Sequence, residues 1–439
     1  MWNPMKNDRQ DVAGKSRERV IAPNPLSSRG REQKADPWIW ISLMMMLVLS
    51  FVVFEALSRR GSSDLSIHAT WASEGDFLHP RTFIRHMAHP LWHGMVAFLT
   101  LFSVPVKLAA ALVTTLMKAA ELWLIHRLMT AYLGGKLGRV QIALAAFAVS
   151  LVAALWVPWV NPHVYLGAGT PNTWHSPTQM IAMVAMLLCA PYTAHCYAEF
   201  ERMLPLQGEQ TCLPRKKAAV LGGLLLLSLL AKPTFMQAFL PAACLYFLAQ
   251  WIRHPRNCRF FIQVIVAVLP AVLFMIAQYL YYFGILVPSQ GKMVLDISWE
   301  KLGYGLRTVL LIAAFPLAQL LLWHRKGRGK DPLVVLTVLF FAVGVVEYLI
   351  LGEDGRRASD GNFGWGMMGA SLMLWVMMLI EFLGDWAQAR QEQAAVESSG
   401  GKAPVLVAAG FAFRIFLLLW HLGSGVYYVV YLLTTGNSL

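Results

Sequence analysis

Residues 37–57 read PWIWISLMMMLVLSFVVFEAL, an apolar run in which Glu55 is the single charged residue. At 1.5 Å of rise per residue, an α-helix of about 20 such residues spans the roughly 30 Å hydrocarbon core of a bilayer. Runs of this kind recur along the chain, which is 57% hydrophobic and 14% charged, whereas a typical soluble domain carries about 25% charged residues. The sequence therefore predicts an all-α integral membrane protein.

The apolar runs predict about eleven transmembrane helices and leave no room for a large soluble domain. Residues 1–36 are polar and basic and lack the apolar core of a signal peptide, so they are predicted to form a cytoplasmic tail. We divide the rest into a transmembrane module at 37–252 and C-terminal helices at 253–439. The predicted helices are residues 37–57, 106–132, 140–158, 178–198, 217–231, 233–252, 259–284, 302–324, 333–352, 366–385 and 404–432.

Residues 89–104, HPLWHGMVAFLTLFSV, decide how the chain threads through the bilayer. The run is apolar, but its 16 residues fall short of the usual 17–25 for a crossing. If it does not cross, the loops after it place fifteen Lys and Arg residues on the cytoplasmic side and five outside; if it crosses, these numbers exchange. Because cytoplasmic loops carry the excess of Lys and Arg, we expect a cytoplasmic N-terminus and a segment 89–104 that lies along the outer surface.

The net charge of +13 does not indicate nucleic-acid binding. Lys and Arg occur in short clusters between apolar runs, as topology signals do, and form no stripe along one folded face. We therefore expect membrane lipids around the protein and no nucleic-acid partner.

This threading sends the loops richest in chemically active residues to the outer face: 58–105, 159–177, 231–234, 285–301 and 353–365. Asp64 follows the first helix closely and could act as a general base if its site is shielded from bulk water. The alternative is that loops at a membrane surface are polar without a catalytic role. The supporting candidates in these loops are His68, Asp76, His89, Trp174, His175 and Asn362.

Two histidines, His89 and His93, are four residues apart and could bind a metal ion from one face of a helix. A third ligand at a recognisable spacing is missing from the sequence. We therefore predict no metal site and no other cofactor.

Several cations map to the outer face, against the positive-inside trend, so a specific partner is expected for them. Guanidinium and ammonium groups bind phosphate oxygens, and a phosphate at the membrane surface would belong to a lipid head group or a lipid-linked substrate. The alternative is surface salt bridges with Glu74, Asp354 and Asp360. The outer cations are Arg81, Arg85, Lys232, Arg356 and Arg357.

Charged residues also occur within the predicted helices. Lys118 and Glu121 are one turn apart, and a buried pair at this spacing is more often structural than catalytic. Glu347 and Arg414 rank as second-line functional candidates.

The first outer loop carries a family likeness in three segments: DLSIHA (64–69), WASEGDFLHP (71–80) and HPLWHGMVAF (89–98). Their order resembles the first outer loop of the GT-C superfamily, membrane glycosyltransferases that use sugars carried on polyprenyl phosphates. The likeness is greatest to the lipid A aminoarabinose transferase and protein mannosyltransferase branch. In these enzymes an Asp and a short amphipathic segment precede a Gly-Asp-aromatic-x-x-Pro turn, and a second surface helix follows.

The resemblance implies a role for particular residues. Asp64 would be the catalytic base or would orient the acceptor, while Lys232, Arg85, Arg356 and Arg357 would hold the donor phosphate. Many members of the superfamily have a paired acid where this chain has Asp64 alone. A metal-dependent mechanism is therefore not expected.

The function expected from these observations is an inverting glycosyltransferase of the bacterial inner membrane. It would transfer a sugar from a polyprenyl-phosphate donor to a lipid or surface-glycan acceptor on the extracytoplasmic face. The alternatives are a secondary transporter, a flippase or polymerase of lipid-linked glycans, or a non-enzymatic subunit of an envelope assembly. Transporters usually show inverted repeats and broken helices, and the sequence has no clear pair of such halves.

Overall fold

The computed structural model describes residues 36–61, 63–74, 89–161, 169–282, 292–325, 331–355, 361–398 and 405–435. Its elements are α1 (Pro37–Arg59), α2 (Asp64–Glu74), α4 (Pro90–Thr100), α5 (Val106–Leu133), α6 (Arg139–Val149), α7 (Pro177–Gln207), a 3-10 turn (Gly208–Gln210), α8 (Arg215–Ala231), α9 (Pro233–Arg253), α10 (Cys258–Tyr282), β1 (Met293–Leu295), α11 (Trp299–Arg325), α12 (Pro332–Ile350), β2 (Leu351–Glu353), α13 (Gly364–Ser398) and α14 (Val405–Thr435).

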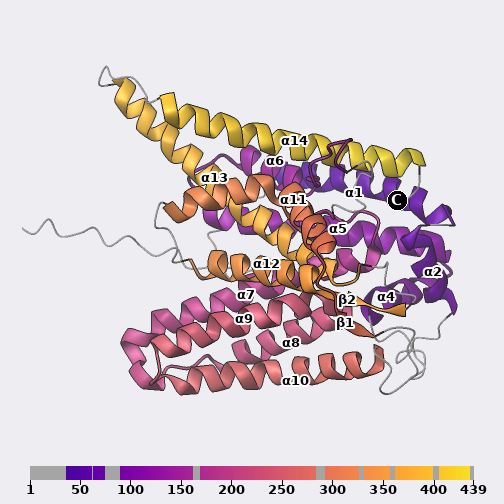
Figure 1. Ribbon diagram of the computed structural model, residues 1–439, viewed down its shortest axis with the longest axis horizontal. Coiled ribbons are helices and arrows are strands. Elements are labelled where there is room, and N and C mark those ends of the chain that lie inside the picture. Colours follow the sequence, from indigo (N-terminus) through magenta and orange to yellow (C-terminus); the bar gives the residue numbers. More distant parts are fainter. Residues whose placement is uncertain are drawn as a thin grey trace, which may run out of the picture.

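Long helices lie side by side in one elongated bundle (Figure 1). Within the described residues, nine of them are long and apolar enough to cross a membrane: α1, α5, α7 and α9–α14. The prediction of an all-α, multi-pass membrane protein is thereby confirmed. The two remaining predicted crossings correspond to the shorter helices α6, of 11 residues, and α8, of 17 residues.

One end of the bundle holds described parts of the loops that were predicted to share a face (Figure 1). The short surface helices α2 and α4 lie there, beside the antiparallel pair β1–β2, in which Met293 is opposite Glu353. This pairing joins the chain after α10 to the chain after α12. That this end faces the outside of the cell remains a prediction.

The segment 89–104 forms the short helix α4, which packs against α2, α5 and α8. Its 11 residues give a length of about 16 Å, roughly half the hydrocarbon core. This length agrees with the expectation that the segment does not cross the bilayer.

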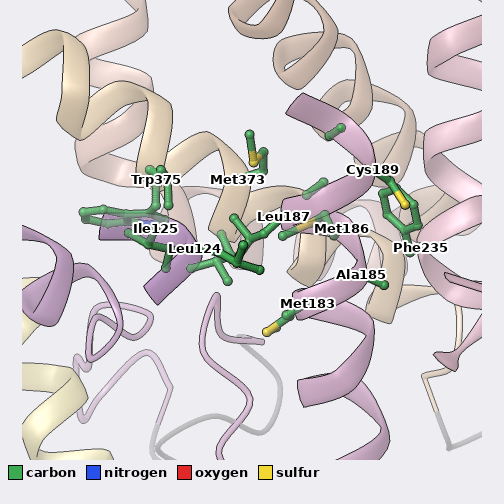
Figure 2. Packing of buried hydrophobic residues seen from close by; sticks show 14 of the residues in the cluster. Leu124, Ile125, Met183, Ala185, Met186, Leu187, Cys189, Phe235, Met373 and Trp375 are labelled. Atoms are coloured by element: carbon green, nitrogen blue, oxygen red, sulfur yellow. The ribbon is translucent and has the colours of Figure 1, made fainter. Parts of the chain in front are cut away.

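The core of the bundle is centred on α7 and α13. These two helices are the most buried of the nine: 83% of the residues in the most apolar stretch of α7 are buried, and 89% of those in α13. Figure 2 shows where they meet α5, with Leu187 of α7 close to Leu124 and Trp375 of α13 close to Ile125. A helix buried on all sides by protein needs no amphipathic pattern. Helices α7 and α13 therefore form the closely packed centre of the bundle.

The predicted helix at 140–158 is wrong in its second half. Helix α6 ends at Val149, and residues 152–157 run without helical structure through buried surroundings. Non-helical backbone at membrane depth is tolerated only where protein groups satisfy its N–H and C=O groups. Asn161 bonds Val157 and Leu155 locally, but most of the other partners of this segment lie 20 or more residues away, so local patterning could not reveal the break.

Helix α14 supplies one set of these partners. The Ala153 N–H donates to the His421 carbonyl oxygen at 3.2 Å, and His421 Nδ1 donates back to the Ala153 carbonyl oxygen at 2.7 Å. The Trp156 N–H donates to Ser424 Oγ at 3.0 Å. A Cβ on Gly425 would lie 1.8 Å from the Leu151 carbonyl oxygen, so only glycine allows α14 to approach this closely.

Asn172 and a buried ion pair supply the second set of partners. Asn172 Nδ2 donates to the carbonyl oxygens of Val149 and Val152, at 2.9 and 2.8 Å. Asn172 Oδ1 accepts from Lys118 Nζ at 2.8 Å, and Lys118 is paired with Glu121 at 2.7 Å. Both charged side chains are fully buried. The arrangement agrees with the structural role expected for this pair.

We predict that Gly425→Ala destabilises the protein, because the added methyl group forces α14 away from the Leu151 carbonyl. Overpacking of this kind costs about 1–3 kcal/mol. The matched control is Gly423→Ala on the same helix, where a Cβ would meet nothing within 4 Å. Thermal unfolding in detergent should show a lower melting temperature for Gly425→Ala alone. Equal melting temperatures would contradict the packing described here.

A second prediction concerns membrane topology and uses the native cysteines. Cys212 precedes α8 and Cys258 opens α10; both are exposed, and these helices begin at the end of the bundle opposite α2. Trp299 opens α11 after β1, at the same end as α2, and is 90% exposed. In intact cells, an impermeant maleimide should label Trp299→Cys and leave the wild-type protein unlabelled. Permeabilised cells should show labelling of the wild type. Labelling of Cys212 or Cys258 in intact cells would reverse the predicted orientation.

Candidate functional site

Asp64 is held in the first turn of α2 by the residues before it. Ser63 Oγ donates to the Leu57 carbonyl oxygen at 2.6 Å and accepts from the Ser66 N–H at 3.1 Å, so it caps α2 and ties it to the end of α1. A carboxylate in this position is favoured by the helix dipole. The Arg60 guanidinium donates to the carbonyl oxygens at the end of α14. Asp64 therefore lies on a well-anchored turn.

Lys232 lies at the junction of α8 and α9 and is almost fully buried, at 9% exposure. Its backbone is extended, and Pro233 opens α9 directly after it. The Lys232 ammonium is 4.1 Å from the centre of the Trp365 ring, a cation–π contact. Burial lowers the pKa of Lys232 to about 8, while the negative charge of Asp64 acts to raise it. The two predicted residues therefore act on each other across 168 positions of sequence.

His175 completes this group. Its Nδ1 lies 2.6 Å from the Tyr428 hydroxyl of α14, and its ring lies 5.7 Å from that of Trp365. Burial, together with the positive charge of Lys232, lowers the pKa of His175 to about 3. His175 is therefore neutral at physiological pH, and Lys232 supplies the positive charge in this group.

A cavity of about 400 Å³ opens beside Lys232, between α9, α10 and α12. Predicted residues Lys232, His89 and Asn362 line it, as does the second-line candidate Glu347. Glu353 of β2 also lines it and accepts a hydrogen bond from Asn362 Nδ2. The cavity thus combines one cation, two carboxyl groups and three amides with an otherwise largely apolar lining.

Trp174 is a different case among the supporting candidates. Its ring stacks on Phe54 at 5.8 Å and lies 4.8 Å from Lys118 Nζ. The side chain therefore packs over the buried ion pair in the core. His68 lies with His89 and His93, where rings from α2 and α4 meet.

Four predicted site residues lie outside the described residues: Asp76, Arg85, Arg356 and Arg357. Their proposed roles in the loop turn and in phosphate binding remain predictions from the sequence.

Sequence reasoning missed several members of the site. Trp365 was not among the predicted site residues, although its position three residues after Asn362 was a usable signal. Glu353 was not considered, and Tyr428 belongs to an apolar helix with no distinguishing pattern around it. Only the tertiary fold brings Tyr428 to His175, a separation of 253 residues.

Comparison of this chain with protein-family models, with curated proteins and with solved structures finds no match. The site is therefore interpreted from its own geometry and chemistry.

The low pKa of Lys232 predicts a pH-dependent stability. A lysine that is charged when buried costs stability below its folded-state pKa of about 8, and this cost disappears as the pH rises towards the ordinary value of 10.5. Lys232→Met should therefore melt at a higher temperature than the wild type at pH 7, and the difference should shrink between pH 8 and 10.5. Among the described residues, His89, Tyr279, Glu347 and Glu353 line the same cavity, while Asp64 and His175 interact electrostatically with Lys232.

The control for this experiment is Lys216→Met, which changes an exposed lysine at the start of α8. Its melting temperature should follow that of the wild type across the same pH range. A difference between Lys232→Met and wild type that does not vary with pH would show that Lys232 is not a charged, buried group.

Proposed function

We propose that this protein is a membrane glycosyltransferase that moves a sugar from a polyprenyl-phosphate donor to a lipid or surface-glycan acceptor. The observation that carries the proposal is that Lys232 lines a cavity at one end of the helix bundle and that the negative charge of Asp64 acts on it there. The first is a carboxylate able to accept a proton, and the second is a cation able to bind a phosphate. The resemblance to GT-C enzymes, through the first outer loop for Asp64 and through the Lys-Pro at 232–233 for Lys232, implies the same two roles.

An adjoining apolar groove supports a lipid-linked donor. This groove, of about 410 Å³, runs between α4, α5 and α8 and is lined by residues such as Gly94, Phe98 and Val113. It includes Pro90 and Leu230, while the cavity of about 400 Å³ includes His89 and Lys232, so the two spaces neighbour each other along both α4 and α8. A polyprenyl chain fits the apolar groove, and its phosphate would then lie near Lys232.

The proposed reaction needs one base and one cationic site. The acceptor hydroxyl attacks the anomeric carbon, and its proton passes to the Asp64 carboxylate as the new C–O bond forms. The bond between the anomeric carbon and the phosphate oxygen breaks, and the leaving polyprenyl phosphate keeps the electron pair. Lys232 would stabilise the charge that develops on that phosphate. The attack from the opposite face inverts the anomeric configuration.

The transporter alternative has one observation in its favour, the break after α6, because broken helices often form transport sites. In this protein the charged groups nearest the break, Lys118 and Glu121, are fully buried and paired with each other. Asn172 uses its side-chain amide to bond the broken segment itself. Hydrogen bonds within the protein thus account for the break without a transported substrate. We therefore favour the glycosyltransferase hypothesis over the transporter hypothesis.

The proposal predicts a large catalytic defect in Asp64→Asn. Asparagine keeps the size and much of the hydrogen bonding but cannot accept the proton, so the rate should fall by about 10²–10⁴. The measurement is release of polyprenyl phosphate from polyprenyl-phosphate sugars by the purified protein in proteoliposomes. Glu74→Gln, at the exposed far end of the same helix, is the matched control and should keep normal activity. Equal rates for Asp64→Asn and wild type would remove Asp64 as the base.

A further inference from the structure

Three histidines from two surface helices converge next to the cavity that Lys232 lines. One nitrogen from each of His68, His89 and His93 can be chosen so that all three lie within 4.8 Å of one another. The ring centres are 4.9–5.1 Å apart. His68 belongs to α2, whereas His89 immediately precedes α4 and His93 lies in its first turn. The sequence already indicated His89 and His93 as a possible pair of ligands, and the fold brings His68 to them as a third.

Hydrogen bonds orient these rings. His93 Nδ1 lies 3.0 Å from the carbonyl oxygen of His89. A carbonyl only accepts, so Nδ1 of His93 carries the proton and Nε2 presents its lone pair. That Nε2 accepts from Nδ1 of His68 at 3.1 Å, and an ion bound between them would release this proton. Metal-binding histidines are typically arranged in this way, with one ring nitrogen bonded to a backbone carbonyl and the other aimed at the ion.

Two tryptophans enclose the cluster. Trp71 and Trp92 place their rings edge-on to His68, with centres 4.9 and 6.0 Å away. Trp92 is fully buried and donates from Nε1 to Thr114 Oγ1 at 3.2 Å, which fixes this wall to α5. His93 is fully buried, while His68 and His89 are half-buried. An apolar wall with partial access from outside strengthens the binding of a cation by imidazoles.

We propose that His68, His89 and His93 bind one divalent transition-metal ion of the Zn²⁺ class. In a tetrahedral Zn²⁺ site with bonds of 2.0–2.1 Å, neighbouring ligand atoms are about 3.3 Å apart. The nitrogens of His68 and His93 already have nearly this separation, at 3.1 Å, and His89, within 4.8 Å of both, must close by up to about 1.5 Å. An all-imidazole ligand set selects Zn²⁺ and similar ions over Mg²⁺ and Ca²⁺, which prefer oxygen ligands.

The bound ion would join α2 to α4. Asp64 lies four residues before His68 on the same helix, one turn away. The ion would therefore hold the helix that carries Asp64 in place, and water or another oxygen ligand would fill the fourth coordination position. This proposal concerns metal binding alone, so it stands or falls independently of the glycosyltransferase proposal.

The test is metal binding by the full chain, purified without a histidine tag and stripped with a chelator. Equilibrium dialysis against Zn²⁺ should give about one ion per chain. Co²⁺ in place of Zn²⁺ should give the visible absorption of a tetrahedral, nitrogen-ligated ion. His93→Ala should weaken binding by at least roughly 100-fold, since even residues that only support ligands contribute 10- to 100-fold.

The matched control is His254→Ala, which removes a histidine after α9 at the opposite end of the bundle and should leave Zn²⁺ binding unchanged. Size-exclusion chromatography checks that the variants stay folded. Because the wild type alone reports stoichiometry and spectrum, a misfolded variant does not decide the result. Absence of stoichiometric Zn²⁺ binding to the wild type, or normal binding by a folded His93→Ala protein, would overturn the proposal.

Discussion

The need to satisfy every backbone polar group inside a membrane governs this structure. Regular helices meet it on their own, but residues 152–157 cannot, and their N–H and C=O groups are bonded by α14, by α11 and by Asn172. Asn172 in turn is held by the buried Lys118–Glu121 pair. Burying a charged pair costs free energy, and here the pair holds the Asn172 side chain in position to bond the broken segment. The positions of α5, α14 and the loop before α7 all follow from this one requirement.

The same loop connects that requirement to the candidate site. Three residues beyond Asn172, His175 contacts Tyr428 of α14 and lies near Trp365, which in turn lies under Lys232. The low pKa of Lys232 therefore depends on a surrounding wall built from several helices. A cation whose positive charge is poorly solvated binds an anion more strongly than an exposed one, because less water must be removed. This is the physical reason for proposing that Lys232 binds a phosphate.

Much of the fold was predictable from the sequence, because hydrophobic length is a local property. The predicted helix at 106–132 became Val106–Leu133, and that at 233–252 became Pro233–Arg253. The charge distribution predicted that 89–104 does not cross, and the short helix α4 agrees with that prediction. The break after Val149 was not predictable, since it depends on Ser424, His421 and Gly425. The third histidine was hidden for a similar reason, because His68 meets His89 and His93 only through helix packing.

The dependence of residues 152–157 on α14 has a consequence for biogenesis. Ala153 and its partner His421 are 268 residues apart, so a ribosome completes α14 long after α6 has entered the membrane. During that interval the polar groups of the segment need water, lipid head groups or an insertion factor as temporary partners. Final closure of the bundle is therefore a late, post-insertional event. The same event brings Tyr428 to His175, so maturation of the membrane fold and completion of the site are one step.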